Sequence, residues 1–388
     1  MKKEWQTKQL GELCEILDSQ RKPITKRDRT TGKYPYYGAT GIVDYVNDFI
    51  FDEPLVLVGE DGAKWESGES TAFKVEGKCW VNNHAHVLRP LRKTVLDNWL
   101  VYFLNHSDLN EFVSGLTVPK LNQGNLRGIP IPLPPLAEQQ RIVGVLDKAF
   151  AGLATAKANA EKNLKNARAL FESHIQSVFT QRGKGWVVNK LKTVTTKIGS
   201  GATPHGGKKS YRLDGISLIR SLNVHDLGFK YKKLAFLDDV QADELSNVEV
   251  KPHDVLLNIT GASIARCCIV PEDVLPARVN QHVSIIRSIP DMIDPDFLHY
   301  LLISKPYKDK LLQTGEEGGS TRQAITKAQI QDFSVEYPEI MKEQKRVVAK
   351  LDDMLTETQR LSHIYERKLV ALETLKKSLL HQAFTGEL

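Results

Sequence analysis

An internal duplication constrains the fold of this chain more than any other sequence feature. Residues 138–147 recur as residues 343–352 at an offset of 205, and the register then holds without a gap to Thr180 and Thr385. Twelve of these 43 positions are identical, against about two or three expected from ordinary composition. The two halves therefore share one architecture, in which a module is followed by a repeated segment.

Two further blocks extend the duplication toward the N-terminus. Residues 81–89 match residues 279–287 at an offset of 198, and Trp5 aligns with Trp186 at an offset of 181. Offsets that grow from 181 to 205 place insertions in the second copy, as the surface loops of a shared fold tolerate.

The repeated segment has the pattern of a long amphipathic helix. Apolar residues recur at every third or fourth position from Leu136, and the second copy continues the same stripe, interrupted by Thr358 and Lys376. Pro135 and Pro338 stand where a first-turn proline is tolerated. About 45 residues, rising ~1.5 Å each, predict a rod of roughly 65 Å.

The apolar stripe of such a helix must pack against another apolar surface to be shielded from water. Each helix could pack on its own module, but the narrow stripe is typical of a coiled-coil seam and favours mutual packing. If a pseudo-two-fold axis relates the halves, the helices run antiparallel, with the modules at opposite ends. We expect a first module at 1–135, a central helical spacer at 136–182, a second module at 183–337 and a C-terminal spacer at 338–388.

The modules have the pattern of a mixed α/β (α+β) fold with many short, twisted strands. Alternating or short apolar runs bounded by turn residues predict strands at 42–46, 55–58, 80–88, 218–219, 255–259, 267–270 and 279–286. Helices are expected at 98–105 and 296–304. The proline-rich residues 129–135 cannot donate ladder hydrogen bonds along their length, so they predict an edge strand or an extended connector.

Composition places the chain among ordinary globular proteins. Hydrophobic residues make up 41% and charged residues 26% of the 388 positions. No leader-like segment and no run of 18 apolar residues is found, so we expect neither secretion nor membrane spanning. The four cysteines form neither a disulfide framework nor a zinc motif, which indicates a reducing cytoplasm.

Catalytic motifs are mostly absent. Residues 201–208 resemble a phosphate-binding loop, but Gly207 stands where lysine is needed and no helical run follows. Asp61 followed by residues 76–78 (Glu-Gly-Lys) has the order that metal-dependent nucleases use. The same Glu-x-Lys pattern recurs within the predicted helices, so it carries little weight.

Three side chains of the first module are candidate metal ligands, namely Cys79, His84 and His86. Structural histidines are the favoured interpretation, because the second copy has Ser284 at the position of His86. Neither an N-P-P-Y methyltransferase motif nor a G-x-S-x-G motif occurs. We therefore expect no catalytic residue, no cofactor, no metal ion and no enzymatic activity in this chain.

Nucleic-acid binding is better supported. Residues 19–33 hold six basic residues against one acid, and tyrosines follow directly. Such a segment can neutralise phosphates, although a solvated basic loop is the alternative. The net charge of +6 permits a polyanionic partner without demonstrating one.

In the second module the candidate DNA-binding segments are residues 200–210 and residues 318–323. Residues 318–323 are aligned with residues 116–122 of the first copy. Arg322 and Gln323 have side chains that can read guanine or adenine edges in a major groove. The repeated pairs Asn82/Asn280 and His84/His282 could do likewise, but a structural hydrogen-bonding role is favoured because both copies share them. The candidate DNA-binding residues are Arg21, Lys22, Lys26, Arg27, Arg29, Lys33, Tyr36, Tyr37, Thr117, Lys120, Asn122, Ser200, Thr203, Lys208, Lys209, Arg220, Asn223, Ser320, Thr321, Arg322 and Gln323.

Several motifs together resemble one family. YPYYGATG at 34–41, LVGEDGA at 57–63, NNHAHV at 82–87, IPLPPLAEQQRIV at 131–143, LLNITGASI at 256–264 and FTGEL at 384–388 are similar to the specificity subunits of type I restriction-modification enzymes. The resemblance covers essentially the whole chain. It implies two target recognition domains that each read one half of a bipartite, asymmetric site on double-stranded DNA.

The resemblance also implies partners. Two methylation subunits would dock on the helical spacers, and restriction (translocase-nuclease) subunits would join through the complex; adenine methylation and ATP-dependent cleavage would reside in these subunits. The expected docking residues are Glu138, Gln139, Arg141, Glu343, Gln344 and Arg346. The second spacer begins differently from the first, with Pro338-Glu339-Ile340-Met341, so the two joints could hold their modules at different angles. The alternatives are a stand-alone DNA-binding protein or a coiled-coil scaffold without restriction partners.

Overall fold

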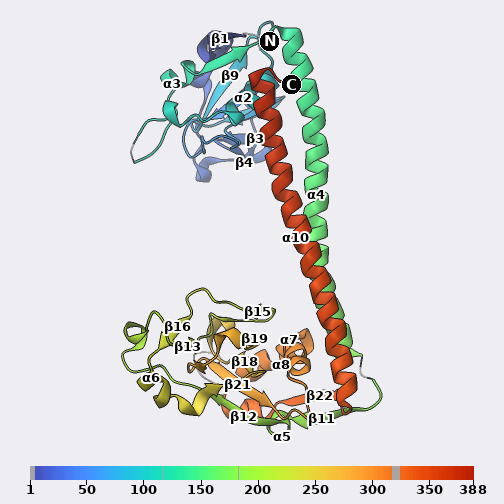
Figure 1. The fold of residues 1–388 in the computed structure, drawn as a ribbon. Coiled ribbons are helices and arrows are strands. Elements are labelled where there is room, and N and C mark those ends of the chain that lie inside the picture. Colours follow the sequence, from blue (N-terminus) through green and yellow to red (C-terminus); the bar gives the residue numbers. More distant parts are fainter. Residues whose placement is uncertain (1–4, 116, 182, 317–323) are drawn as a thin grey trace. The chain divides into compact units, whose positions relative to one another are not determined.

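The computed structural model describes residues 5–115, 117–181, 183–316 and 324–388 (Figure 1). The chain divides into two compact units, one of Met1–Lys162 with Tyr365–Leu388 and one of Asn163–Ile364. Each unit combines a mixed α/β module with parts of two helices of 45 residues, α4 (Leu136–Thr180) and α10 (Met341–Thr385). The predicted mixed α/β modules and long helices are confirmed.

The first module contains two four-stranded sheets. The strand orders are β2-β9-β6-β7 and β4-β3-β8-β5. The β3–β8 pair is parallel and the other described pairs of these sheets are antiparallel. The elements are β1 (Gln6–Gln9), α1 (Leu10–Leu13), β2 (Cys14–Ile16), β3 (Thr31–Gly38), β4 (Gly41–Val46), β5 (Phe51–Asp52), β6 (Leu55–Gly59), β7 (Ala72–Val75), β8 (Lys78–Val81), β9 (Ala85–Pro90), α2 (Asp97–His106), α3 (Gln123–Arg127) and β10 (Pro130–Leu133).

The second module repeats the topology of these two four-stranded sheets and adds a two-stranded sheet, β14-β15. Its sheets have the orders β12-β21-β18-β19 and β16-β13-β20-β17, and β13–β20 is again a parallel pair. The duplication read in the sequence is therefore a duplication of the fold. The elements are β11 (Trp186–Lys190), α5 (Leu191–Val194), β12 (Thr195–Ser200), β13 (Ile216–Ile219), β14 (Val224–His225), β15 (Gly228–Phe229), β16 (Ala235–Leu237), α6 (Asp239–Glu244), β17 (Glu249–Val250), β18 (Val255–Asn258), β19 (Cys267–Ile269), β20 (Ala277–Val279), β21 (Val283–Ser288), α7 (Pro295–Ile303), α8 (Lys305–Glu316), α9 (Lys327–Asp332) and β22 (Ser334–Pro338).

Two of the predicted strands are each divided by a turn. Residues 80–88 fall into β8 and β9, and residues 279–286 into β20 and β21. In both turns an asparagine side chain bonds the backbone two residues on: Asn82 Oδ1 accepts from His84 N (2.8 Å) and Asn280 Oδ1 from His282 N (3.1 Å). This is the local geometry for which asparagine is favoured in turns, so the repeated asparagines have the structural role.

The proline-rich connector is an edge strand, as expected. β10 pairs with β1 alone, and Gln9 and Thr7 stand opposite its prolines. The corresponding expectation for Pro338 is wrong, because this residue ends β22 and α10 begins only at Met341. Both long helices nevertheless begin and end at positions related by the 205-residue offset.

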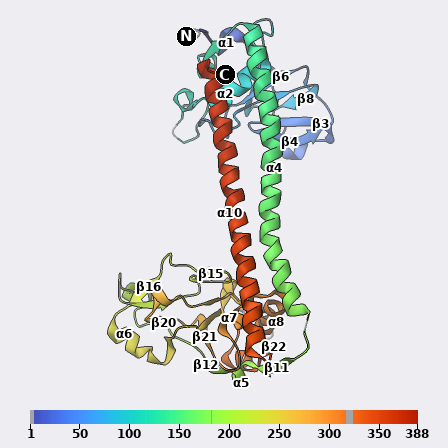
Figure 2. The same cartoon turned by 45° about the vertical axis from the view of Figure 1, so that its right-hand side comes forward.

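In the first unit the two long helices run antiparallel. Arg141 Nη2 donates to Leu388 O (2.6 Å), and Lys157 Nζ pairs with Glu373 Oε1 (2.8 Å), so residue numbers rise along α4 as they fall along α10. Figures 1 and 2 both show the end of α10 beside the start of α4. Ile142 of α4 lies in one core with the module and with residues of α10. Packing on the module and packing between helices therefore occur together.

The second unit has the same organisation. Phe171 and Ile175 of α4 share a hydrophobic core with Leu351 of α10 and with α7 of the module. All four cysteines of the chain are buried and unpaired. Among the described helices, none has the length and apolar character that crossing a bilayer requires.

Candidate nucleic-acid interface

One end of the first module gathers segments that are distant in the sequence. Glu60, in the turn after β6, donates its backbone N–H to His84 O (2.9 Å) and accepts at its carbonyl from Leu121 N (2.8 Å). Arg21 Nη1 donates to Ala85 O (2.8 Å), so the basic segment also begins here. We call residues 18–33, 59–62, 82–86, 114–115 and 117–122 the loop end of the first module. It joins the two regions that the sequence indicates as DNA-binding.

The second module has an equivalent loop end. Ile259 N donates to His282 O (3.0 Å), and Ile325 N donates to Ile259 O (2.9 Å). Gly201 N donates to Asn280 O (3.2 Å). We define this loop end as residues 200–203, 259–261, 280–282 and 324–326. The candidates Ser200 and Thr203 therefore lie beside the repeated asparagine turn.

Much of the basic segment is available to a ligand. Lys22, Lys26, Arg27 and Lys33 are exposed, and the side chain of Arg27 is 87% exposed. Arg29 is more constrained, since it bonds Asp44 Oδ2 (3.1 Å) and lies over the ring of Tyr36 at 4.5 Å. The four exposed cations are the best placed to contact phosphates.

Three of the expected DNA-binding residues instead stabilise the modules. The side chain of Arg21 is 13% exposed and pairs with Glu60 Oε2 (2.5 Å). Tyr36 is 1% exposed, and its hydroxyl accepts from Ile24 N (2.9 Å). Asn223 is fully buried, where it bonds Arg220 N (3.1 Å) and Lys230 O (2.8 Å). Buried polar groups need such partners, and these partners leave none of the three free to meet DNA.

The remaining candidates are in mixed environments. Ser200, Thr203, Lys209 and Thr117 are exposed, whereas Tyr37 and Asn122 are half-buried. Arg220 lies over the ring of Tyr211 at 5.2 Å and donates to Lys233 O. The Lys208 side chain and residues Ser320, Thr321, Arg322 and Gln323 lie outside the described residues.

The positions of α3 and α9 correct the sequence alignment of residues 116–122 with residues 318–323. Asn122 caps α3 by accepting from Asn125 N, and Thr326 caps α9 by accepting from Gln329 N. Asp61 and Thr260, which correspond in the two copies, form bridges to Lys120 and Ala324. Asn122 therefore corresponds to Thr326 and not to a residue within 318–323.

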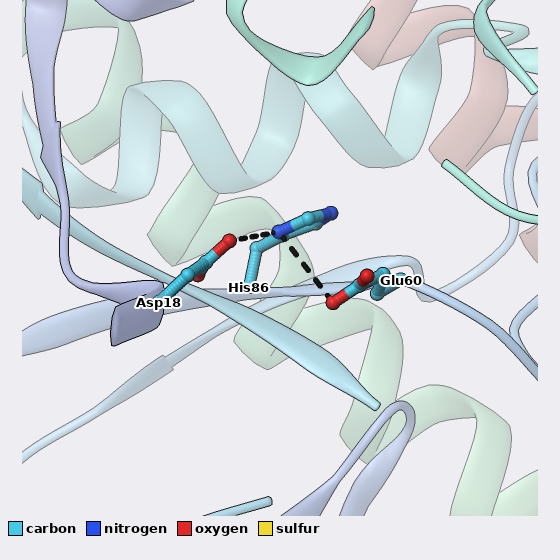
Figure 3. Close-up of side chains that lie close together, drawn as sticks. All are labelled: Asp18, Glu60 and His86. Atoms are coloured by element: carbon cyan, nitrogen blue, oxygen red, sulfur yellow. Dashed lines mark hydrogen bonds and ion pairs between the residues drawn. The ribbon is translucent and has the colours of Figure 1, made fainter. Parts of the chain in front are cut away.

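A buried charge cluster lies under the first loop end (Figure 3). His86 is fully buried, with Nδ1 at 2.6 Å from Asp18 Oδ2 and 3.9 Å from Glu60 Oε2. Glu60 is paired with Arg21 and, through Oε1, with Lys120 Nζ (2.8 Å). Burial raises the pKa of Glu60, but hydrogen bonds from Lys120 and Arg21 outweigh it and hold the pKa below its usual range.

The donor atoms of Asp18, Glu60 and His86 lie within 4.8 Å of one another, a spacing that could hold a metal ion. Arg21 and Lys120 already balance the two carboxylates, so a divalent cation would add uncompensated charge. The cluster is therefore better described as an ion-paired network than as a metal site. The other suggested ligands do not join it: His84 bonds Asp61 Oδ1 (2.5 Å), and Cys79 lies in a hydrophobic core where burial raises its pKa to about 11.

The weak catalytic patterns do not form sites among the described residues. Asp61 is bonded to His84, while Glu76 pairs with Lys74 Nζ (2.6 Å). After the glycine-rich residues 201–206, the described chain continues as a short 3-10 helix at Gly207–Ser210. A phosphate-binding loop would be followed by an α-helix.

The start of each long helix is fastened to its module by a buried glutamine. Gln139 Oε1 accepts from Leu96 N (3.0 Å), and its Nε2 donates to Thr94 O and Pro134 O (both 2.9 Å). Gln344 makes the same three kinds of contact, with Asp294 N (2.8 Å), Met292 O (3.0 Å) and Pro338 O (2.8 Å). Both glutamines are fully buried, so they hold the joint and offer nothing to a partner subunit.

Arg141, Glu343 and Arg346 remain exposed on the helices, and Glu138 is half-buried. Arg141 Nε pairs with Glu138 Oε2 (2.8 Å), and Arg346 Nη1 with Glu343 Oε2 (3.5 Å). Sequence reasoning missed a second joint contact, from the hydroxyl of Tyr102 to Asp147 and from that of Tyr300 to Asp352. Tyr102 and Tyr300 are related by the 198-residue offset, and Asp147 and Asp352 by the 205-residue offset, which was the available signal.

Comparisons with known proteins agree with this architecture. A family model for the "Type I restriction modification DNA specificity domain" matches residues 2–166 and 226–367. A putative type I restriction enzyme specificity subunit of Haemophilus influenzae is 38% identical over 144 residues, which cover 37% of this chain and 36% of that protein. The EcoBI specificity subunit of Escherichia coli is 27% identical over 309 residues, covering 73% of this chain and 63% of that subunit.

The MjaVIII specificity subunit of Methanocaldococcus jannaschii is 22% identical over 414 aligned positions, covering 99% of this chain and 93% of that subunit. This chain thus spans about a third of the matched Haemophilus protein but nearly all of the archaeal one.

Two solved structures have the same fold. A chain from a structural study of the assembly and conformational transition of a type I R-M system superposes with a TM-score of 0.73 at 19% identity, covering 100% of this chain and 99% of that one. The HsdS subunit of Thermoanaerobacter tengcongensis gives a TM-score of 0.60 at 19% identity, covering 100% and 98%. Because the family model matches the first module, residues 226–337 of the second module and parts of both long helices, the chain belongs to the family of type I restriction-modification DNA specificity proteins.

Proposed function

We propose that the chain is the specificity subunit of a type I restriction-modification complex in the prokaryotic cytoplasm, and that each module reads one half of a bipartite, asymmetric site on double-stranded DNA. The observation that carries this proposal is the pair of loop ends, which share one scaffold but present different side chains. A protein that reads two different half-sites with two copies of one module needs a shared scaffold and different side chains on it.

The differences between the loop ends are chemical. Asp61 of the first module corresponds to Thr260 of the second, and Asn83 corresponds to Gln281. The asparagine turns that support them are the same in both copies. Because each base pair presents its own pattern of donors and acceptors in the major groove, different side chains on one scaffold would select different bases.

The basic segment supplies affinity without sequence preference in this proposal. Lys22, Lys26, Arg27 and Lys33 stand at or beside the first loop end, where they would contact phosphates and position the duplex. In the second module, Lys209 is exposed and follows residues 200–203 in the sequence, and Lys327 is exposed directly after residues 324–326.

The long helices would dock the two methylation subunits. They carry exposed apolar side chains, among them Val145 (40% exposed), Leu170 (49%), Val370 (68%) and Leu375 (48%). Arg141, Glu343 and Arg346 would add charged contacts, whereas the buried Gln139 and Gln344 would not take part. In this proposal the chain itself has no catalytic activity and needs no cofactor, and restriction subunits join through the assembled complex.

The test is to express the full chain with and without the methylation subunits of its system, and to sequence the modified bases in the host genome. We expect adenine methylation at one asymmetric, two-part sequence when all subunits are present, and none when either component is omitted. Methylation by the chain alone would contradict the proposal. A stand-alone DNA-binding or scaffold protein would instead leave the activity of the methylation subunits unaltered.

A further inference from the structure

The two modules differ in the connection between two corresponding strands. In the first module Ala39 and Thr40 alone join β3 to β4, whereas in the second module residues 220–234 join β13 to β16. The strands correspond because the sheet orders are β4-β3-β8-β5 and β16-β13-β20-β17. The longer connection contains the β14–β15 pair, and Figure 1 shows β15 beside β19 of the same module. We call residues 220–234 the inserted hairpin.

The inserted hairpin begins at the second loop end. Ile219, the residue before it, accepts at its carbonyl oxygen from Asn280 N (3.1 Å), and Asn280 belongs to the second loop end. The carbonyl oxygen of Ser221 accepts from Nδ2 of the buried Asn258 (2.9 Å), which directly precedes residues 259–261 of the same loop end. These two hydrogen bonds fasten the start of the hairpin beside the asparagine turn.

Further hydrogen bonds bring the end of the hairpin back to its start. The buried Asn223 donates from Nδ2 to Lys230 O (2.8 Å), and its carbonyl oxygen accepts from Lys230 N (2.8 Å). Arg220 Nη2 donates to the carbonyl oxygen of Lys233. Residues 230–233 therefore lie against residues 220–223, at the base of the hairpin and next to the second loop end.

The base of the hairpin is a basic surface. Lys230, Lys232 and Lys233 are exposed, and none of their ammonium groups forms an ion pair with the part of the chain that the structure describes. Tyr231 stands among them with 52% of its surface exposed, and its hydroxyl donates to Asp273 Oδ1 (3.0 Å). Exposed cations without a carboxylate partner are suited to neutralise phosphates.

The acidic residue of the hairpin does not neutralise these lysines. In the sequence of residues 220–234, four residues are basic and Asp226 is the sole acid. Asp226 Oδ1 accepts from Cys267 N (3.1 Å), and Oδ2 is paired with Lys308 Nζ, which lies outside the hairpin. The positive charge of the hairpin is therefore left to a partner.

The backbone of Lys233 supports a role for its side chain. Its φ of 61° lies in the left-handed region, which glycine or asparagine adopts at lower cost. The turn is closed by a hydrogen bond from Leu234 N to Tyr231 O (2.9 Å). A lysine in such a conformation is expected where the side chain itself is needed, because strained positions concentrate at functional sites.

The first module carries its exposed cations on a different connection. They lie in the basic segment at 19–33, between β2 and β3. The corresponding connection of the second module, residues 201–215, has the exposed Lys209, but its Arg212 is paired with Asp238 Oδ2 (2.7 Å). The two copies thus place their exposed cations on different connections of one topology.

Resting on the proposed function, we propose that the inserted hairpin is a phosphate-binding element of the second module. Lys230, Lys232 and Lys233 bind backbone phosphates beside the second half-site, as the basic segment does beside the first. Phosphate contacts fix position and add affinity but carry no base identity. The hairpin therefore strengthens binding to every sequence and leaves the preference for particular bases to the loop end.

The experiment uses the chain assembled with its methylation subunits and a duplex that carries the sequence the complex methylates. In Lys230→Gln/Lys232→Gln/Lys233→Gln we expect the slope of log K against log salt to become shallower by about 2.7, since each of three phosphate contacts contributes about 0.9. The preference for bases within each half-site should not change. Lys230→Arg/Lys232→Arg/Lys233→Arg keeps the charge and should keep the wild-type slope.

Ethylation interference, which identifies phosphates whose alkylation blocks binding, locates the contact. The triple glutamine variant should lose interference beside one half-site, and Lys26→Gln/Arg27→Gln should lose it beside the other. Lys251→Gln is the matched control within the second module. Lys251 is an exposed lysine before β18, at the end of that strand opposite to Asn258, and its substitution should alter neither the slope nor the interference pattern.

An unaltered slope in the triple glutamine variant would overturn the proposal, as would a lost slope that the arginine variant shares or interference lost beside both half-sites. Weaker assembly with the methylation subunits at unaltered DNA binding would also overturn it, and would make the hairpin a protein-binding surface. In each of these results the wild-type complex still binds its two half-sites. If the wild-type complex selects no sequence, the proposed function itself has failed.

Discussion

Arg21 and Arg27 belong to one basic segment, yet their guanidinium groups have different environments. Arg21 is bonded to Glu60 and to the carbonyl of Ala85, whereas the side chain of Arg27 is 87% exposed. Removing one member of a buried ion pair leaves an uncompensated charge, and removing an exposed cation does not. The two residues therefore have separable roles.

We expect Arg21→Ala to lower the free energy of unfolding by about 3 kcal/mol, because Glu60 loses a buried partner. The double variant Lys26→Ala/Arg27→Ala should leave stability unchanged. It should instead weaken binding to all DNA sequences alike and make the slope of log K against log salt shallower by about 1.8, since each phosphate contact contributes about 0.9. Thermal denaturation and binding titrations at several salt concentrations measure both effects. Unaltered salt dependence in the double variant would contradict a phosphate-binding role.

Each module is joined to its long helix by the same buried glutamine contact, which occurs once in each copy. The buried amides of Gln139 and Gln344 satisfy backbone groups at the start of α2 and α7 and at the residues before α4 and α10. The second joint has one more residue between the glutamine and the carbonyl it bonds, Pro338 instead of Pro134. The same glutamine contact therefore accommodates two connectors that differ in length by one residue.

We predict that Gln139→Ala or Gln344→Ala lowers the free energy of unfolding by about 2–3 kcal/mol, because buried backbone groups lose their partners. Gln140→Ala is the matched control, since Gln140 is the exposed neighbour in the same helical turn, and it should change stability by less than about 0.5 kcal/mol. Chemical denaturation of the full chain tests this. Equal effects of Gln139→Ala and Gln140→Ala would show that the buried glutamine contact is not required for stability.

At the scale of the whole molecule, α4 and α10 are the elements common to both units, and each helix is continuous at the residues where the units divide. We propose that their length sets the non-specific gap between the two half-sites. Seven residues inserted after Lys162 and seven after Ile364 would keep the apolar seam in phase and add ~10 Å of helix. At 3.4 Å per base pair, the gap should lengthen by about three base pairs.

Sequencing the sites methylated by the assembled variant measures the gap, and the bases of each half-site should not change. An insertion of five residues in each helix is the control, because it rotates the seam out of register and should abolish site-specific methylation. A gap that stays at its original length with seven inserted residues would refute this role of the helices.

Local sequence patterns were enough to predict the architecture. The 205-residue repeat, the three-four spacing from Leu136 and the short apolar runs depend on neighbours within a few positions or on comparison of the chain with itself. The predicted helix at 98–105 is α2 at Asp97–His106, and the paired long helices are as expected. The turns at Asn82 and Asn280 divided two predicted strands, because an asparagine side chain competes with the ladder in a way that hydrophobic alternation does not reveal.

The roles of the polar residues were decided by tertiary structure. Arg21 is ion-paired because Glu60, 39 residues away in the sequence, folds beside it, while Arg27 pairs at 3.5 Å with its exposed sequence neighbour Asp28. His86 meets Leu121 across 35 residues, and Gln139 meets Leu96 across 43. The charge and hydrogen-bonding capacity of each side chain follow directly from the sequence. Whether that side chain faces solvent or a buried partner depends on long-range packing. Packing therefore fixes the cost of desolvation, and with it the role of each residue.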